Sequence, residues 1–362
     1  MAIRQGAVEG VVINPAFWKG KRVLVTGHTG FKGSWLSLWL QSLGAQVAGY
    51  ALAPPTDPSL FEAAEVGQSM TSVIGDIRDM AKLQDVLAEH QSEIVIHMAA
   101  QALVRYSYQT PVETYSTNVM GTVHLLEAVR NTPGVKAVVN VTTDKCYENK
   151  EWAWGYRENE PMGGHDPYSN SKGCSELVTN AYRRSFFQDK GIALASARSG
   201  NVIGGGDWAA DRLIPDIMRA FERNQPAIIR NPYATRPWQH VLDPLAGYLR
   251  LAESLWHRKA AEEAYNFGPL QDDAASVRAV IEMAREVVGG ASVHYHEEIQ
   301  GPHEAGLLLL ESAKARSRLG YRSRLGLAEG VRRTLHWYRE QAGGADARML
   351  CEQDILEYAA LP

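Results

Sequence analysis

The sequence predicts an α/β protein in which a doubly wound parallel sheet is joined to a second, smaller mixed α/β lobe. Over residues 20–200, short apolar runs alternate with segments of helical length, a pattern typical of a parallel sheet with helices on both faces. A glycine-rich loop stands directly between the first apolar run and the first helical segment. This arrangement is typical of the Rossmann fold, where such a loop binds a dinucleotide.

The individual elements follow from the spacing of apolar residues. Short apolar runs predict strands at 21–26, 45–51, 72–75, 93–99, 136–142 and 191–198. Segments of helical length and spacing predict helices near 30–43, 79–90, 111–130 and 167–188, and amphipathic patterns predict two more near 276–289 and 327–341. We therefore expect a leader over 1–19, an NAD-binding Rossmann domain over 20–200, and a substrate-binding lobe over 201–362 that interleaves partly with it.

Composition narrows the class of protein and its partners. The chain has 362 residues, 45% of them hydrophobic and 22% charged, with a net charge of −4 and no run of five basic residues. These values are typical of a soluble globular protein and predict neither nucleic-acid nor membrane binding. The first fifteen residues lack the apolar core of a signal peptide, and no apolar stretch is long enough to span a membrane.

Cysteine and histidine usage predicts a cytoplasmic protein without a metal site. Cys146, Cys174 and Cys351 are odd in number and far apart, so we interpret them as free thiols in a reducing compartment. The segment 294–297 holds two histidines and a glutamate in strand-like alternation. No further matched ligand accompanies them, so we expect no metal ion.

The glycine loop supplies most of the predicted cofactor-binding residues. Gly27, Gly30 and Gly33 have the spacing G-x-x-G-x-x-G, and Thr29, Phe31 and Lys32 lie within the loop. Glycines allow a tight turn and a close approach of the pyrophosphate, while the following helix presents its N-terminal N–H groups. Lys32 could meet a cofactor phosphate or could be an exposed lysine on the first helical turn.

The ends of the next strands complete the predicted cofactor site. Residues 50–54 contain neither the carboxylate that holds the ribose of NAD nor an arginine for NADP, so this position does not decide between them. Asp76, with Ile77 after it, could accept from the adenine amino group or could be a helix N-cap. Ala99 and Ala100 are small residues at a strand end, where a nucleotide could pass close to the backbone or the strand could simply pack tightly.

Two groups of polar residues indicate chemistry. Tyr168 and Lys172 lie four residues apart on one face of a predicted helix, and we expect the ammonium to lower the pKa of the phenol toward that of a general base. Thr143, Asp144 and Lys145 follow a strand at the sheet edge where ligands of open α/β sheets bind. An ordinary turn with Asp144 as a turn residue would also explain that triplet.

These motifs resemble the extended short-chain dehydrogenase/reductase superfamily and, within it, the cytidine branch of the nucleotide-sugar 4,6-dehydratases. The segments that carry the resemblance are 27–36, 97–108, 114–128, 143–164, 166–177, 200–208 and 230–244. The resemblance implies an NAD-dependent lyase that converts CDP-glucose into a 4-keto-6-deoxy sugar for deoxysugar biosynthesis, including lipopolysaccharide O-antigen. It also implies a homodimer.

The resemblance also implies roles for the polar residues. Tyr168, helped by Lys172 and Thr143, would take the proton of the sugar 4-hydroxyl, and Asp144 would protonate the departing 6-hydroxyl. Lys145 stands where thymidine-nucleotide relatives have a glutamate, so it would either take the C5 proton or remain charged and stabilise the enolate.

The remaining site residues are also assigned by the resemblance. It places Asn118 and Ala99 near the cofactor, and Gln101, Asn201, Arg212 and Arg236 near the nucleotide sugar. An arginine beside Trp238 could instead be a structural stacking partner, and we interpret Trp208 and Tyr233 as packing residues.

Two other functions remain open from the sequence. A nucleotide-sugar 4-epimerase, or a dehydratase acting on another nucleotide sugar, would share the fold, NAD and the Tyr168–Lys172 pair. An epimerase would not need Asp144 as an acid. A redox-sensing protein that only binds NAD would have no use for Tyr168, Lys172, Thr143 and Asp144 together.

Overall fold

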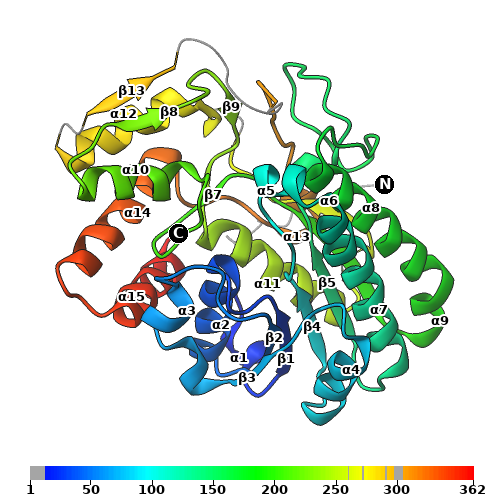
Figure 1. Cartoon of the computed structure of the whole chain (residues 1–362). Coiled ribbons are helices and arrows are strands. Elements are labelled where there is room, and N and C mark those ends of the chain that lie inside the picture. The colour runs from blue at the N-terminus through cyan, green and yellow to red at the C-terminus, as the bar shows by residue number, and fades with distance from the viewer. Residues whose placement is uncertain (1–12, 260, 271–272, 290–291, 297–304) are drawn as a thin grey trace, which may run out of the picture.

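A seven-stranded parallel sheet runs through the centre of the computed structural model (Figure 1), which describes residues 13–259, 261–270, 273–289, 292–296 and 305–362. From one edge to the other its strands are β3 (Thr71–Ile74), β2 (Gln46–Ala51), β1 (Arg22–Thr26), β4 (Ile94–His97), β5 (Ala137–Val141), β6 (Ala193–Arg198) and β11 (Ala264–Asn266). The order 3-2-1-4-5-6 is that of dinucleotide-binding sheets. The predicted fold class and all six predicted strands are confirmed.

Alternating apolar residues bury both faces of this sheet. In β1, Val23 and Val25 belong to one core cluster and Leu24 to the other. The first cluster is covered by α2 (Phe31–Ser42) and α11 (Leu242–Trp256), and the second by α4 (Met80–Glu89) and α7 (Gly121–Asn131). A strand buried on both faces needs an apolar residue at every position, which explains the unbroken apolar runs in the sequence.

Helix starts and ends follow local residue chemistry. The helix α8 (Pro167–Tyr182) begins with proline at its first position, and the Asp166 carboxylate caps it by accepting from the N–H of Ser169. The predicted helix near 111–130 contains α6 (Pro111–Tyr115), a π-helical turn and then α7. The predicted helices near 276–289 and 327–341 are α12 (Val277–Val288) and α14 (Leu327–Ala342). Every helix that the sequence predicts is therefore present.

The chain beyond residue 200 contributes to the sheet layers as well as to the smaller lobe. The helix α11 and the edge strand β11 both come from this part, and α11 lies against the sheet (Figure 1). The sequence did not predict α11, which has Pro244 in its first turn and Gly247 in its interior, because these two residues weaken a helix prediction. The domain limits at residues 19 and 200 remain predictions.

The rest of the lobe is built from short elements around a small core. Ile217, Ala227, Ile229 and Ile281 form this core. The elements of this region are α10 (Leu213–Glu222), β7 (Val202–Ile203), β8 (Ala227–Ile229), β9 (Thr235–Arg236), β10 (Gln239–His240), β12 (Ala275–Ser276) and β13 (Val293–Tyr295). The remaining helices are α1 (Pro15–Trp18), α3 (Leu60–Ala63), α5 (Val104–Gln109), α9 (Gln188–Lys190), α13 (Ala313–Leu319) and α15 (Ala347–Ala360). Within the described residues, no helix combines the length and apolar character needed to cross a bilayer.

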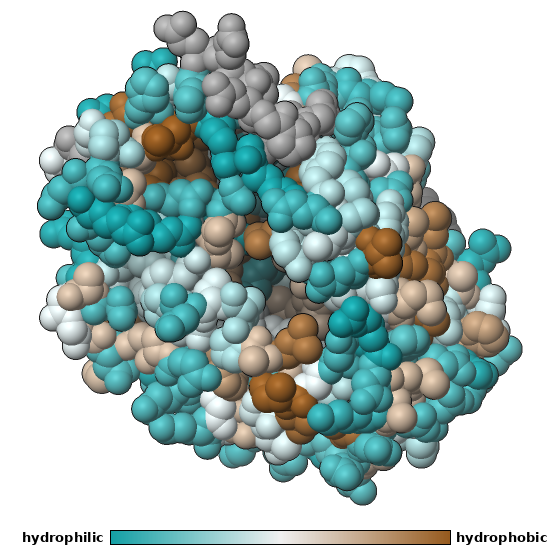
Figure 2. Space-filling view, in the orientation of Figure 1, coloured by the Kyte–Doolittle hydropathy of each residue, from teal (hydrophilic) through white to brown (hydrophobic). Residues whose placement is uncertain are grey.

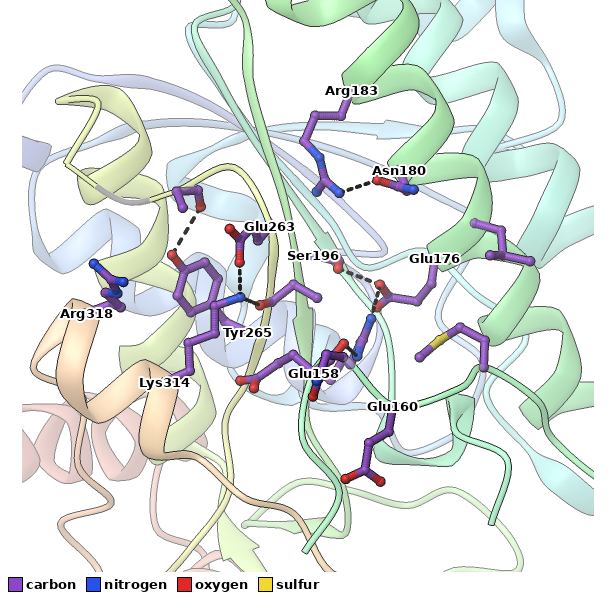
Figure 3. Close-up of a pocket in the computed structure, with 16 residues that line it drawn as sticks. Glu158, Glu160, Glu176, Asn180, Arg183, Ser196, Glu263, Tyr265, Lys314 and Arg318 are labelled. Atoms are coloured by element: carbon purple, nitrogen blue, oxygen red, sulfur yellow. Dashed lines mark hydrogen bonds and ion pairs between the residues drawn. The ribbon is translucent and has the colours of Figure 1, made fainter.

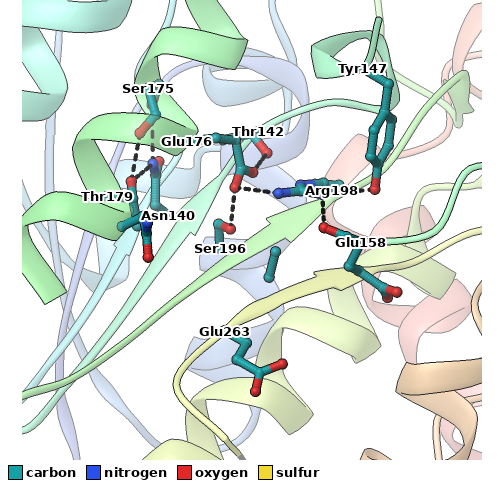
Figure 4. A network of polar contacts seen from close by, with 12 residues as sticks. Asn140, Thr142, Tyr147, Glu158, Ser175, Glu176, Thr179, Ser196, Arg198 and Glu263 are labelled. Carbon is teal, nitrogen blue, oxygen red and sulfur yellow. Dashed lines mark hydrogen bonds and ion pairs between the residues drawn. The ribbon is translucent and has the colours of Figure 1, made fainter. Parts of the chain in front are cut away.

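A buried ion pair connects α8 with the carboxyl ends of β5 and β6 (Figure 4). Arg198 Nη2 lies 2.8 Å from Glu176 Oε2, and both side chains are almost fully buried. The Glu176 carboxylate also accepts from the hydroxyls of Thr142 (2.5 Å) and Ser196 (2.6 Å). Burial disfavours its ionisation, but Arg198 and these hydrogen bonds outweigh burial and hold the pKa of Glu176 below its ordinary value.

We expect Arg198→Met to lower the free energy of unfolding by about 3–5 kcal/mol, because it leaves the Glu176 charge buried without its partner. Denaturant unfolding of the chain measures this loss. The double variant Glu176→Gln/Arg198→Met should lose less, since no buried charge remains. Arg332→Met is the control: it breaks an exposed pair with Glu329 and should cost at most about 1 kcal/mol. An equal loss in Arg198→Met and Arg332→Met would contradict this prediction.

Candidate active site

The glycine loop between β1 and α2 packs so closely that two of its glycines admit no side chain. Gly27 has a φ of +77°, and a Cβ there would lie 2.8 Å from the backbone N of Ala99. A Cβ on Gly33 would lie 2.1 Å from the carbonyl O of Gly27. Gly30 is different, because a Cβ there would meet nothing closer than 3.5 Å, so open space stands before the helix.

The start of α2 fits a phosphate group. Gly30 is the N-cap residue and offers no side chain, so no side-chain oxygen satisfies the first N–H groups of the helix, which begin at Phe31. Thr29 turns its hydroxyl to the carbonyl O of Leu52 (2.9 Å). Free N–H groups and the positive end of the helix dipole attract an anion. The loop therefore has the geometry to hold the pyrophosphate of a dinucleotide.

Lys32 faces the interior of the site. Its ammonium donates to the hydroxyls of Tyr248 (3.0 Å) and Ser199 (3.3 Å). Burial, followed by the nearby Arg212, lowers the pKa of Lys32 to about 7, while Asp144 acts in the opposite direction. The alternative of an exposed lysine is wrong, because the turn of α2 directs this side chain toward β6 and α11.

No carboxylate stands at the end of β2, and Asp76 is the first carboxylate after β3. Asp76 pairs with Arg78 (2.5 Å) and accepts from its N–H. Asp79, and not Asp76, caps α4, so the helix-cap alternative for Asp76 is wrong. Ile77 is buried in the core against Gly121. Ala99 packs on Gly27, with Ala100 directly after it.

The catalytic residues predicted from the sequence do come together. Thr143 and Asp144 follow β5, and the Thr143 hydroxyl donates to Asp144 Oδ1 at 3.0 Å. Tyr168, on α8, lies close enough to Thr143 and Asp144 for both to influence the pKa of its phenol. Lys145 Nζ lies 3.8 Å from Asp144 Oδ1. The structure thus brings a phenol, a hydroxyl and a carboxylate together after the end of β5.

Electrostatics at Tyr168 differ from the sequence-based expectation. Burial raises the pKa of Tyr168 to about 12, and the hydrogen bond from Thr143 and the charge of Arg212 only partly oppose it. Lys172 Nζ donates to the carbonyl O of Val141 (3.3 Å), and burial followed by repulsion from Lys32 lowers its pKa to about 8. The expectation that Lys172 lowers the pKa of Tyr168 is therefore wrong for the chain without a cofactor.

Two predicted ligand-binding residues use their polar groups within the protein. Asn118 donates to the carbonyl O of Gln101 (3.0 Å) and to the Ser171 hydroxyl (2.9 Å), and accepts from the N–H of Gln101. The side chain of Gln101 donates to Thr114 and accepts from the N–H of Leu103. Asn118 and Gln101 thereby fix the loop after β4 against α8, beside the site.

The residues predicted to bind the nucleotide sugar lie at the lobe side of the site. Asn201 has a φ of +39°, and its buried Oδ1 has no hydrogen-bond partner among the residues that the structure describes. Arg212 is near enough to Tyr168 and Lys32 to influence both pKa values. Arg236 donates to the carbonyl groups of Ala305, Thr235 and Gly306.

The two aromatic residues interpreted as packing residues differ. Trp208 contacts Trp337 and Tyr338 edge to face, so its packing role is confirmed. Tyr233 is 71% exposed, and the packing interpretation is wrong for it because it lies on an open loop between β8 and β9.

The sequence did not reveal that Ser199, Gly200 and Tyr248 lie near Asp144. Ser199 and Tyr248 share a hydrogen bond, and the carbonyl O of Ser199 accepts from the N–H of Asp144 (3.3 Å). Asp144 is fully buried, and within the described part of the chain its Oδ2 has no hydrogen-bond partner. A Cβ on Gly200 would lie 1.8 Å from that oxygen. The glycine in the segment 199–201 is the one sequence signal that could have indicated this close contact.

A separate cavity of about 670 Å³ lies between α8, β11 and α13 (Figure 3) and contains none of the catalytic residues. Its wall includes the Glu176–Arg198 pair, so it borders the network that holds β5. As for metals, no three His, Cys, Asp or Glu side chains converge among the residues that the structure describes. Glu297, considered as a ligand, lies outside them.

Comparisons with known proteins agree with this geometry. A family model described as GDP-mannose 4,6 dehydratase matches residues 24–334. The CDP-glucose 4,6-dehydratase of Salmonella typhimurium is 56% identical over 96% of this chain and 98% of its own length. A UDP-glucose 4-epimerase of Bacillus subtilis is 26% identical over 89% of this chain and 98% of its own.

Solved structures show the same likeness. A dTDP-glucose 4,6-dehydratase from Streptomyces venezuelae, solved with NAD bound, superimposes with a TM-score of 0.77. Its sequence is 26% identical, and the match covers 89% of this chain and 98% of that one.

Gly200→Ala should lower the free energy of unfolding by about 1–3 kcal/mol, because the added methyl group overlaps the Asp144 carboxylate. Adding Asp144→Ala to the same chain should recover most of that loss, since it vacates the space. Gly330→Ala, where a Cβ meets its nearest atom at 3.4 Å, is the matched control and should stay within about 1 kcal/mol of the wild type. Thermal and denaturant unfolding measure these variants together with the single variant Asp144→Ala and the wild type. Additive effects of Gly200→Ala and Asp144→Ala would refute the close contact.

Proposed function

This chain belongs to the GDP-mannose 4,6 dehydratase family of extended short-chain dehydrogenase/reductases, and from that premise we propose its reaction. It is an NAD-dependent hydro-lyase that converts CDP-D-glucose into CDP-4-dehydro-6-deoxy-D-glucose and water. The observation that carries the proposal is that Tyr168 lies beside Thr143 and Asp144, whose carboxylate accepts from the Thr143 hydroxyl. This arrangement sets a base for the 4-hydroxyl beside an acid for the 6-hydroxyl.

NAD is the cofactor of this chain. The uncapped start of α2, the open space at Gly30 and the tight contacts of Gly27 and Gly33 fit its pyrophosphate. When bound, NAD accepts a hydride from C4 and returns it to C6, and its positive ring favours the phenolate of Tyr168. The residues that we propose to contact it are Gly27, Thr29, Gly30, Phe31, Lys32, Gly33, Asp76, Ile77, Ala99, Ala100, Asn118, Tyr168 and Lys172.

The protein side chains then move protons. Tyr168 removes the proton of the 4-hydroxyl, and the resulting ketone makes the C5 proton acidic. Asp144 protonates the 6-hydroxyl as it leaves. Lys145 Nζ lies 3.8 Å from Asp144 Oδ1, and we propose that Lys145 stabilises the enolate rather than acting as the C5 base.

The preference for CDP-glucose is supported by the relatives. The 56% identical protein is a CDP-glucose 4,6-dehydratase, whereas the epimerase is only 26% identical. We propose that the guanidinium of Arg212 meets the nucleotide diphosphate, because arginine forks suit phosphate oxygens. We propose Asn201 as a second contact, through the NH2 group of its side-chain amide, since its amide oxygen can only accept. We include Gln101 and Arg236 among the substrate contacts, although their polar groups also serve the fold.

We also propose that the protein works as a homodimer in the cytoplasm. Its large exposed apolar residues include Val112 on α6, Met120 in the turn before α7, and Leu177 on α8. Figure 2 shows hydrophobic surface on the right-hand side, where Figure 1 places α7 and α8. The cysteines are free thiols, which agrees with a reducing compartment. A role in making deoxysugars for the O-antigen remains a prediction from the resemblance.

The double variant Met120→Glu/Leu177→Glu should shift the protein from dimer to monomer, because two charges per chain would be buried in the proposed interface. Sedimentation velocity at several concentrations measures the change. Ile228→Glu, at an equally exposed apolar position on β8, is the control and should leave the dimer intact. A wild-type chain that sediments as a monomer would overturn the proposed dimer without affecting the proposed reaction.

Incubation with CDP-glucose deuterated at C4, in the presence of NAD, tests the proposed reaction. Mass spectrometry should find a product that has lost one water and carries the deuterium on C6. Asp144→Asn should lower the rate of water loss by about 100-fold or more, while reduced cofactor still forms. An unchanged mass with inversion at C4 would indicate an epimerase instead. Parallel reactions with UDP-, GDP- and dTDP-glucose test the base, and a higher kcat/KM for any of them would overturn CDP-glucose as the substrate.

A further inference from the structure

The proposed catalytic side chains come from two different elements of the fold. Tyr168 and Lys172 belong to α8, whereas Thr143 and Asp144 follow β5. A displacement of about 1 Å between groups that act on one substrate can cost about 100-fold in rate. The reaction therefore depends on contacts that fix α8 against the end of β5.

Two side chains of α8 contact consecutive residues at that strand end. Lys172 Nζ donates to the carbonyl O of Val141 at 3.3 Å, and the Thr142 hydroxyl donates to Glu176 Oε1 at 2.5 Å. Lys172 and Glu176 are four residues apart, so they lie on one face of the helix, about one turn from each other. Glu176 therefore contacts the residue that immediately precedes Thr143.

The Glu176 carboxylate also contacts the neighbouring strand, β6 (Figure 4). It accepts from the Ser196 hydroxyl at 2.6 Å and from Arg198 Nη2 at 2.8 Å, and both of these side chains are almost fully buried. The next residue along the chain is Ser199, whose carbonyl O accepts from the N–H of Asp144 at 3.3 Å. One carboxylate thus joins α8 to both of the segments that lie around Asp144.

A second buried contact joins β5 to α8 farther along the helix (Figure 4). Asn140 Nδ2 donates to the hydroxyls of Thr179 (2.7 Å) and Ser175 (3.1 Å). Thr179 is 1% exposed and Thr142 is 5% exposed, so the two threonines are buried alike. Thr179 comes eleven residues after Tyr168, which corresponds to about 16 Å along a helix. This contact stabilises the same pair of elements at a distance from the proposed base.

We infer that Glu176, acting through Thr142, is a positioning residue for the reaction, an inference that rests on the proposed dehydration. Its two oxygens already accept three hydrogen bonds, so it orients its neighbours and takes no part in proton transfer. It fixes α8, which carries the proposed base, relative to the strand end that carries the proposed acid. When the Thr142 hydroxyl is removed, Ser196 and Arg198 still satisfy the carboxylate, so the strand end gains freedom while the fold persists.

Thr142→Val and Thr179→Val, both in the full-length protein with NAD, form a matched pair that tests this role. Each keeps the volume of threonine and removes one buried hydroxyl between β5 and α8. Each also leaves the partner, Glu176 or Asn140, with another hydrogen bond. Steady-state kinetics measure kcat and KM with whichever of the four nucleotide sugars the wild type dehydrates fastest, and denaturant unfolding measures stability. Thr142→Ser retains the hydroxyl and tests rescue.

We expect the two valine variants to unfold at similar denaturant concentrations. Only Thr142→Val should lose kcat, by about 10-fold or more, with KM unchanged within about twofold, and Thr142→Ser should restore most of the kcat. Equal kcat values in the two valine variants would show that the Thr142 hydroxyl only stabilises the fold. Failure of serine to restore kcat would show that this hydroxyl is not the group that matters. Either result overturns the positioning role.

A double-mutant cycle tests whether Glu176 acts through Thr142. Glu176→Gln removes the charge and one of the two acceptor oxygens, and it should lower kcat by a factor similar to that of Thr142→Val. The double variant Thr142→Val/Glu176→Gln should lose little more than the larger of the two single losses, because both changes break the same link. Multiplicative losses would show that the two residues act independently and would overturn the inference. A wild-type protein that dehydrates none of the four sugars would refute the proposed function itself, a result distinct from each of these.

Discussion

The parallel register of β1, β4 and β5 is the constraint on which the site depends. Thr26, His97 and Asn140 are aligned across these three strands, so the segments that follow the strands leave the sheet at one edge. The glycine loop follows the first strand, the small residues follow the second, and the Thr143–Asp144 pair follows the third. Residues more than a hundred positions apart in the sequence therefore meet, as expected for ligand sites of open α/β sheets.

The polar groups behind that edge keep it in place. Thr26 and His97 are buried, and the threonine Oγ1 lies 2.7 Å from the histidine Nδ1. Burial lowers the pKa of His97 to about 3, so it stays neutral and serves as a hydrogen-bonding strut. Glu176 and Arg198 play the same part between β5, β6 and α8. Fully satisfied buried networks hold one geometry strongly, whereas a network with a missing partner is costly.

The sequence predicted most of the sheet, because strands depend on local patterns. Apolar runs mark the strands, and the residues that we propose to be catalytic, Thr143, Asp144, Tyr168 and Lys172, lie next to elements that those runs define. What the sequence could not predict depends on contacts between distant segments. Only packing against the sheet shows that α11 continues through Pro244 and Gly247, and the closeness of Gly200 to Asp144 requires β6 and β5 to be neighbours.

The pKa of Tyr168 shows the same limit, since burial outweighs the opposing effects of Thr143 and Arg212, and only the folded structure shows the burial.

The burial of Asp144 lowers the stability of the fold. A carboxylate oxygen without a partner is unfavourable in the interior. Gly200 packs directly against this carboxylate and leaves it no room to turn away. The same burial keeps water from an intermediate whose ketone, acidic C5 and leaving group must all react in order. A site that excludes water must also supply its own protons.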